Sequence, residues 1–156
     1  MIKIIIIRGR MGSGKTCFVN KISQELKFEK VIIDEIKKEI PKMPNRTETI
    51  FKEAGKRANE LLKQGKNIVV EEAFLDKKHL NTFLQMIENI KKYKIQHILL
   101  ECSEKTAISR KNNLSSKTIK HQFSKRVDKL KNELIFNTDI ISTDKIFNQI
   151  KKQHFI

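Results

Sequence analysis

The stretch that most constrains this chain is GRMGSGKT, residues 9–16, which stands between the apolar run IKIIII and the amphipathic segment FVNKISQEL. Its spacing, G-x-x-x-x-G-K-[ST], is the Walker A pattern, and its glycines permit backbone conformations that side chains forbid. The main-chain amides of residues 12–16 then point inward at the start of a helix and form a cradle for an anion. This pattern predicts a phosphate-binding loop.

Within this loop, each residue type has a distinct expected task. Lys15 is expected to reach the β- and γ-phosphates of a nucleoside triphosphate, and Thr16 to hold Mg²⁺ through its hydroxyl. The residues that we predict to bind the nucleotide here are Gly12, Ser13, Gly14, Lys15, Thr16 and Cys17.

Along the rest of the chain, apolar runs alternate with amphipathic segments, which is the βα pattern of a parallel sheet. The apolar runs are nearly continuous, as in strands that helices cover on both faces. We therefore predict an α/β, three-layer P-loop NTPase fold, with a five-stranded parallel sheet flanked by helices, in a single domain of residues 1–156. The expected strands are 3–7, 30–33, 67–70, 96–101 and 134–137, and the expected helices are about 14–26, 47–64, one through 80–90, one ending near 112, 118–131 and one from 143.

Membrane and disulfide chemistry are not expected. The longest apolar run, Ile4 to Ile7, is far shorter than the roughly 20 residues that cross a bilayer, and no secretory signal is evident. Cys17 and Cys102 are far apart, without a C-x-x-C spacing, which favours two reduced, buried thiols in a cytoplasmic protein.

The chain is strongly basic, with 33 Lys and Arg against 18 Asp and Glu and a net charge of +15. Such an excess favours polyanionic partners such as nucleic acid, although an AT-rich genome also enriches lysine. The expected helix 118–131 would align Lys117, His121, Lys125 and Lys129 on one face. This stripe is either a solvated helix face or a contact for a nucleic-acid backbone.

Asp34 follows the second expected strand. Ligands bind beyond the carboxyl ends of parallel strands, so Asp34 is expected to face the same cleft as the loop. A carboxylate there can accept the proton of an attacking hydroxyl, while capping a helix N-terminus is the alternative role. Lys37, one turn further, can hold an anionic group of the acceptor.

Five segments together resemble the P-loop kinases of the polynucleotide kinase-like group, AAA-type small ATP-binding domains that include phage polynucleotide 5′-kinases and zeta-toxin-like relatives. They are GRMGSGKT, DEIKKEI, NIVVEEAFL, CSEKTAISRK and LIFNTDIISTDKIFNQI. The resemblance implies that Asp34 is the general base and that Lys37 stands where an arginine grips acceptor phosphate. It also implies an acidic residue near the metal and acceptor at Glu71 or Glu72. Strand alternation places these two on opposite faces, and we assign Glu71 to the metal and Glu72 to the acceptor.

The same resemblance implies a helical lid at about residues 110–118. Arg110 matches its first arginine, which binds the nucleotide and neutralises the transferring γ-phosphoryl group. Where the family often has a second arginine, this chain has Leu114, and the basic residues nearby are Lys111, Lys117 and Arg126. Lysine cannot reproduce the bidentate fork of arginine.

The sequence therefore predicts an ATP- and Mg²⁺-dependent phosphotransferase whose catalytic residues are Asp34, Lys15 and Arg110. The acceptor favoured at this stage is a hydroxyl on a polynucleotide, at a 5′ end or on a modified base. A kinase of a nucleoside, nucleotide, sugar or antibiotic is the alternative, and a non-catalytic nucleotide-binding module is the third hypothesis.

Overall fold

The computed structural model describes residues 1–110 and 115–152. The strands are β1 (Lys3–Arg8), β2 (Glu29–Ile32), β3 (Ile68–Glu71), β4 (Lys94–Glu101) and β5 (Leu134–Asn137). The helices are α1 (Lys15–Leu26), α2 (Ile33–Glu39), α3 (Arg46–Lys63), α4 (Lys77–Gln85), the 3₁₀ turn η1 (Ile90–Lys92), α5 (Glu104–Arg110), α6 (Ser116–Phe123) and α7 (Thr143–Lys152).

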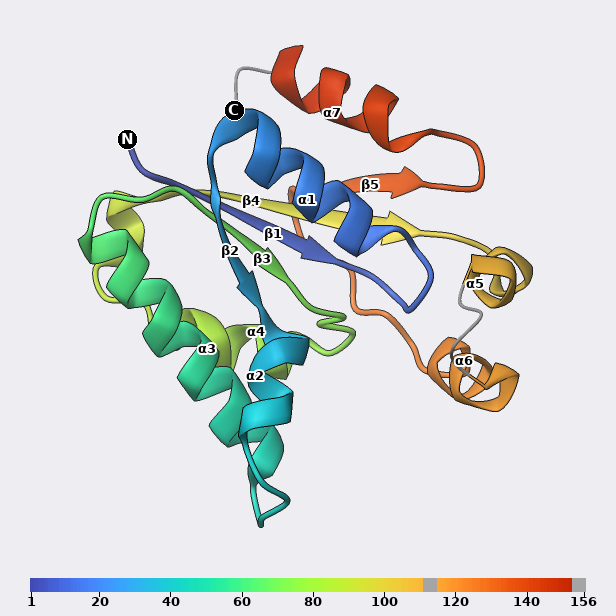
Figure 1. The fold of residues 1–156 in the computed structure, drawn as a ribbon, viewed down its shortest axis with the longest axis horizontal. Helices are drawn as coiled ribbons and strands as arrows, with labels where there is room; N and C mark the ends of the chain where they lie inside the picture. Colours follow the sequence, from blue (N-terminus) through green and yellow to red (C-terminus); the bar gives the residue numbers. More distant parts are fainter. Residues whose placement is uncertain (111–114, 153–156) are drawn as a thin grey trace.

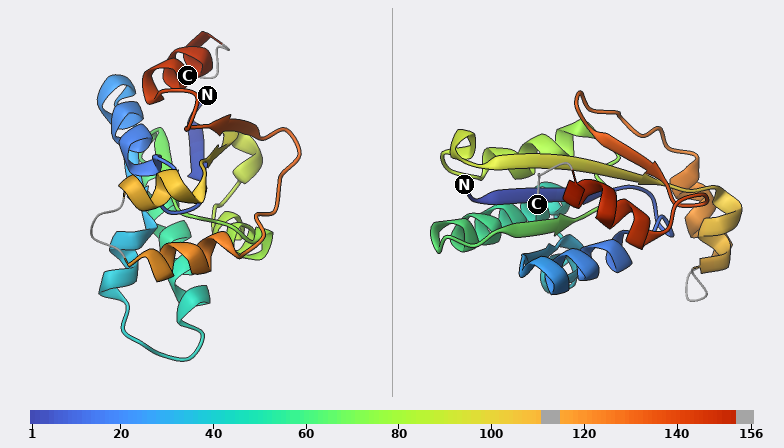
Figure 2. Two further views of the ribbon diagram at one scale, coloured as in Figure 1. Left: turned by 90° about the vertical axis from the view of Figure 1, so that its right-hand side faces the viewer. Right: turned by 90° about the horizontal axis from the view of Figure 1, so that it is seen from above.

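The five strands form one parallel sheet in the order β2-β3-β1-β4-β5 (Figure 1). The predicted five-stranded parallel sheet flanked by helices is thus confirmed. β1 lies at the centre, between β3 and β4, so the loop that follows it leaves from the middle of the sheet. Because all strands run the same way, their carboxyl ends meet at one edge, and α5 and α6 lie beyond that edge (Figures 1 and 2).

Helices cover both faces of the sheet and make two hydrophobic cores. Ile4 and Ile6 of β1 pack in the core that includes α3 and α4, whereas Ile5 and Ile7 pack in the core that includes α1 and α7. All four isoleucines are fully buried. The unbroken apolar run of β1 therefore follows from its central place in a sheet that is covered on both faces.

Two expected helices differ from the observed ones. The helix expected through 80–90 ends at Gln85, and η1 follows it. The helix expected at 118–131 is wrong in its second half, because α6 ends at Phe123 and residues 124–133 form an irregular segment, called here the post-α6 segment. The predicted i, i+4 stripe is therefore not formed, since Lys125 and Lys129 lie outside the helix.

The helix-cap alternative for Asp34 is also wrong. α2 begins at Ile33, directly after β2, and its N-cap residue is Ile32. Asp34 lies instead in the first turn of α2, where a carboxylate is favoured by the helix dipole.

The predicted lid at about residues 110–118 is only partly described by the structure. The middle of the predicted lid, including Lys111 and Leu114, lies outside the described residues. Within residues 1–110 and 115–152, none of the helices has the length and apolar character needed to cross a bilayer.

Candidate active site

The loop between β1 and α1, here called the P-loop (residues 9–16), folds tightly against its surroundings. Gly9, Gly12 and Gly14 all have positive φ. A Cβ atom on Gly12 would lie 2.6 Å from the Cα atom of Ala107 in α5, and one on Gly9 would lie 2.2 Å from the carbonyl oxygen of Leu100. The glycines thus allow α5 to pack directly on the P-loop, which brings Arg110, the last residue of α5, beside it.

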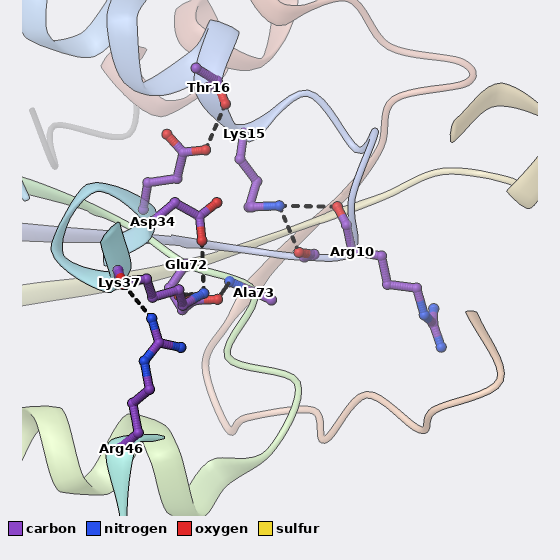
Figure 3. A network of polar contacts seen from close by, with 10 residues as sticks. Arg10, Lys15, Thr16, Asp34, Lys37, Arg46, Glu72 and Ala73 are labelled. Carbon is purple, nitrogen blue, oxygen red and sulfur yellow. Dashed lines mark hydrogen bonds and ion pairs between the residues drawn. The ribbon is translucent and has the colours of Figure 1, made fainter. Parts of the chain in front are cut away.

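The side chain of Lys15 lies inside the curve of the P-loop (Figure 3). Its Nζ donates hydrogen bonds to the carbonyl oxygens of Gly9 at 2.9 Å and Arg10 at 3.1 Å. An ammonium group is thereby held at the mouth of the anion cradle, where it is positioned to contact a bound phosphate.

Asp34 and the P-loop line one cavity of about 270 Å³, here called the P-loop cavity. β1, β2 and β3 bring these residues together, because their carboxyl ends meet at one edge of the sheet. The lining residues are Met11, Gly12, Gly14, Lys15, Thr16, Cys17, Asp34, Glu71 and Arg110. Of the nucleotide-binding residues predicted from the sequence, Ser13 is not in this lining, because it is fully buried. Cys17 is exposed and Cys102 is half-buried, so the prediction of two buried thiols is wrong.

Thr16 and Glu71 provide oxygen atoms that suit Mg²⁺. The Thr16 hydroxyl donates to Oε1 of Glu71 at 2.7 Å, and the buried Oε2 of Glu71 has no hydrogen-bond partner among the described residues. In the described part of the chain, no three His, Cys, Asp or Glu side chains gather closely enough to bind a metal ion alone. These two residues fit a Mg²⁺ ion that takes its other ligands from phosphate and water, as this ion usually does.

The structure separates Glu71 from Glu72. Glu71 contacts Thr16 of α1, whereas Glu72 forms an ion pair of 2.5 Å with Lys37 of α2 (Figure 3). Nζ of Lys37 also lies 2.7 Å from Oδ1 of Asp34. Burial lowers the pKa of the Lys37 ammonium, but Glu72 and Asp34 outweigh this effect and raise it above its ordinary value. Lys37 therefore stays charged and holds the two carboxylates together.

The guanidinium of Arg110 bridges the P-loop and Thr138, the residue after β5. Its Nη1 donates to the carbonyl oxygen of Gly12 at 3.0 Å and to the hydroxyl of Thr138 at 2.9 Å, and its Nη2 donates to the Thr138 carbonyl at 2.8 Å. Thr138 follows β5, and its hydroxyl also contacts the carbonyl of Ser13 at 3.0 Å. The sequence analysis missed Thr138, because a single threonine after the last strand gives no local signal.

A second cavity, of about 340 Å³, adjoins the P-loop cavity and shares Gly14, Cys17 and Arg110 with it. The start of α7 and the turn before it form the rest of its wall; the residues are Thr138, Ile141, Ser142 and Thr143. We call it the β5–α7 cavity. The two cavities together extend from the strand ends to the N-terminus of α7.

Arg10 and Met11 attach the P-loop to α6, which the sequence analysis also missed. The guanidinium of Arg10 donates to the carbonyl oxygens of Gln122 at 3.4 Å and Lys125 at 2.6 Å, and it lies 5.0 Å from the centre of the Phe123 ring. The amide of Met11 donates to Oε1 of Gln122. These carbonyls are bound by a distant arginine, which helps to explain why α6 ends here. The positions of Arg10 and Met11 are unspecified in the Walker A pattern, so the pattern could not reveal this role.

A central parallel sheet, a glycine-rich loop closed around a lysine and an arginine held against that loop define a domain with the P-loop NTPase-type fold. The chain belongs to the AAA domain family AAA_33, whose model matches residues 4–129. No curated protein matches the sequence.

Solved structures with the same fold include several kinases. A sugar kinase from Janibacter sp. HTCC2649 superposes with a TM-score of 0.75 at 11% identity, over 97% of this chain and 94% of the other. The Mycobacterium tuberculosis APS kinase CysC, in complex with AMPPNP and APS, gives 0.74 at 12% identity, over 97% and 96%. A gluconokinase from Sinorhizobium meliloti 1021 gives 0.69 at 14% identity, over 98% and 96%. At these identities the likeness establishes the fold, and membership of the polynucleotide kinase-like group stays a prediction.

Proposed function

We propose that this protein is a Mg²⁺-dependent kinase that transfers the γ-phosphoryl group of ATP to a hydroxyl group of an acceptor. The observation that carries the proposal is that Asp34, Glu71 and Lys15 line a single cavity at the carboxyl ends of three strands. A phosphate cradle, a metal-binding carboxylate and a candidate base are thus within one site. Fold neighbours named as kinases of sugars and of APS are consistent with this function.

In this proposal, the triphosphate lies in the P-loop cavity and the nucleoside in the adjoining β5–α7 cavity. The amides of the P-loop and the ammonium of Lys15 bind the phosphate oxygens, and Arg110 on the shared wall supports the γ-phosphoryl group as charge shifts during transfer. Mg²⁺, held by Thr16 and Glu71, would neutralise charge on the β- and γ-phosphate oxygens.

Asp34 is the proposed general base. Its carboxylate accepts the proton of the acceptor hydroxyl as the oxygen of that hydroxyl attacks the γ-phosphorus. The bond from the γ-phosphorus to the β–γ bridging oxygen breaks, and ADP leaves. Lys37 holds Oδ1 of Asp34 at 2.7 Å, which fixes the direction in which this carboxylate faces.

A polynucleotide is the second candidate acceptor. The observation that favours it is charge: the net charge is +15, and the basic residues Lys117, Lys120, Lys125, Arg126, Lys129 and Lys131 are all exposed. The helical stripe on which the sequence prediction relied is not present, so general attraction to phosphates is the remaining support.

A screen with labelled ATP tests the proposal. The protein is incubated with γ-labelled ATP and Mg²⁺ against 5′-hydroxyl DNA and RNA at low salt, and against nucleosides, sugars and aminocyclitols. We expect transfer to at least one acceptor, no transfer with EDTA and a loss of about 10²-fold or more with Lys15→Ala. If ATP binds but no acceptor is labelled, and Asp34→Asn changes no measurable property, the protein is a non-catalytic nucleotide-binding module.

A further inference from the structure

A third cavity, of about 420 Å³, lies on the side of Asp34 and Lys37 that faces α3, and we call it the α3 cavity. Its wall comes from α2, α3, the segment after β3, the start of α4, the end of α6 and the start of the post-α6 segment. The residues used below are Lys37, Phe51, Glu72, Asp76, His79 and Lys125. Since Lys37 lies in its wall and also contacts Asp34 of the P-loop cavity, the α3 cavity borders the site of the proposed base.

One wall of this cavity is aromatic. The rings of Phe51 and His79 stack with their centres 4.9 Å apart, and Phe51 also lies 5.4 Å from Phe74. Phe51 and Phe74 are buried, so His79 presents the outer ring of this stack. A flat aromatic wall favours contact with the apolar face of a ring.

Another part of the wall is polar, and its half-buried cation, Lys37, is already committed to carboxylates. Nζ of Lys37 lies 2.7 Å from Asp34 and 2.5 Å from Glu72 (Figure 3). Arg46 donates hydrogen bonds to the carbonyl oxygens of Lys37 and Ile40, which holds the end of α2 in place. The sequence analysis expected Lys37 to hold an anionic group of the acceptor, and this geometry does not favour that role.

An anionic acceptor would meet two carboxylates at this position. The ammonium of Lys37 already donates to both carboxylates, so an anion that used its third N–H would lie beside Asp34 and Glu72, and the side chain of Glu72 is only 7% exposed, where water screens the repulsion little. The remaining acidic residue in the wall, Asp76, adds repulsion, and Lys125 is exposed, where water and salt screen its charge.

We infer, on the basis of the kinase activity proposed above, that the α3 cavity binds the acceptor and that this acceptor is a small hydroxyl-bearing molecule without a phosphate or carboxylate group. Its ring lies against the Phe51–His79 wall, and its hydroxyl groups donate hydrogen bonds to Glu72 and Asp34. The hydroxyl next to Asp34 is the one that receives the phosphoryl group. Lys37 is a positioning residue that aligns both carboxylates.

Matched acceptor pairs test this inference. Uridine is compared with uridine monophosphate, and glucose with gluconate, with an uncharged cyclitol and an aminocyclitol as further members. Binding is measured by calorimetry on protein loaded with AMPPNP and Mg²⁺, and transfer is measured by ADP release with ATP. We expect at least one uncharged or cationic member to bind, and to exceed its anionic counterpart at least tenfold in kcat/KM.

The possible outcomes separate the inference from the proposed function. Preferential transfer to an anionic member, or to oligonucleotides, overturns the inference and confirms the kinase. Preferential binding of uncharged members without transfer supports the inference and contradicts the kinase. Binding of no uncharged or cationic member overturns the inference.

Variants at Lys37 distinguish positioning from anion binding. We expect Lys37→Met to lower kcat about tenfold for uncharged acceptors with little change in KM, because Asp34 and Glu72 lose their shared partner, and Lys37→Arg to restore part of the rate. Lys38→Met, which removes the exposed neighbouring charge, is the control and should leave kcat unchanged. A loss confined to anionic acceptors, seen as a higher KM, would show that Lys37 binds an anion.

Discussion

The two regions that flank the P-loop are held in place by different kinds of contact. On the side of α1, β2 and β3, the polar residues come from the P-loop and from the ends of strands. Local sequence patterns indicated Lys15, Thr16 and Asp34, whereas the resemblance to a kinase group indicated Glu71 or Glu72. On the side of α6, the post-α6 segment is held by residues far away in the sequence, chiefly Arg8 and Arg10. We therefore expect variants on the first side to change chemistry at constant stability, and variants on the second side to change stability.

The largest effect is expected for Asp34→Asn. Loss of a general base commonly lowers kcat by about 10²–10⁴-fold, while the amide keeps the size of the side chain and leaves the P-loop intact. Stopped-flow or steady-state measurement of ADP release gives kcat, and calorimetry with AMPPNP gives nucleotide affinity. An Asp34→Asn enzyme that keeps most of its rate would remove Asp34 from the proposed mechanism.

Lys15→Ala also changes the side of the P-loop that faces α1, β2 and β3, but its expected effect differs from that of Asp34→Asn. It removes a charge that touches the phosphates, so we expect a loss of about 10²–10³-fold in kcat/KM. Unlike Asp34→Asn, it should also weaken AMPPNP binding in the calorimeter. Thermal unfolding of the nucleotide-free protein serves as the control and should be nearly unchanged. A large fall in melting temperature would show that Lys15, through Gly9 and Arg10, stabilises the fold.

These two regions also differ in how far the sequence could predict them. The isoleucine run predicted a strand covered on both faces, the glycine spacing predicted the P-loop, and strand alternation predicted that Glu71 and Glu72 separate. Each of these depends on residues close in sequence. The end of α6 could not be predicted in this way, because the chain after Phe123 gives its carbonyl groups to Arg10 and Arg8, and the amide of Asp128 donates to the carbonyl of Leu75. Tertiary hydrogen bonds here override helix propensity.

The sequence could not reveal both partners of Lys37 for the same reason, because one of them is distant in the sequence. Its spacing from Asp34 is visible in the sequence, and it indicated a cation beside the base. Its second partner, Glu72, directly follows β3 and is far away in the sequence, and this ion pair is the basis for the positioning role that we propose for Lys37.

Glu133→Gln tests how the post-α6 segment is held, and we expect this variant to have the largest effect on stability. Oε1 of Glu133 lies 3.3 Å from Nε of Arg8, and both side chains are fully buried. Removing one partner of a buried ion pair typically costs about 3–5 kcal/mol, because the other charge is left uncompensated. Urea unfolding should show this loss, and Glu60→Gln, at an exposed position of α3, is the surface control.

The pair Arg8→Met with Glu133→Leu sharpens this test. Replacing both charges with apolar groups is often close to neutral, so the double variant should recover most of the lost free energy. If Glu133→Gln alone costs less than about 1 kcal/mol, the post-α6 segment is not held by this ion pair.

The smallest effect is expected at His97, which lies on β4 near the same arginine. Burial, together with the smaller effect of the positive charge of Arg8, lowers the pKa of His97 to about 4. Folded His97 is therefore neutral at pH 5, whereas in the unfolded chain, with an ordinary pKa of about 6.5, it is mostly protonated. Since the unfolded state then binds more protons, stability falls as the pH falls from about 6.5 toward 4, by about 2 kcal/mol between pH 7 and pH 5.

The difference in unfolding free energy between wild type and His97→Phe, measured by urea titration at both pH values, isolates this effect from the other titrating groups. We expect the wild type to lose about 2 kcal/mol more than the variant on going to pH 5. Equal pH slopes for wild type and His97→Phe would mean that His97 is protonated in the folded state. In that case, the region of β4 around His97 and Arg8 would be more accessible to water in solution than it is in the structure.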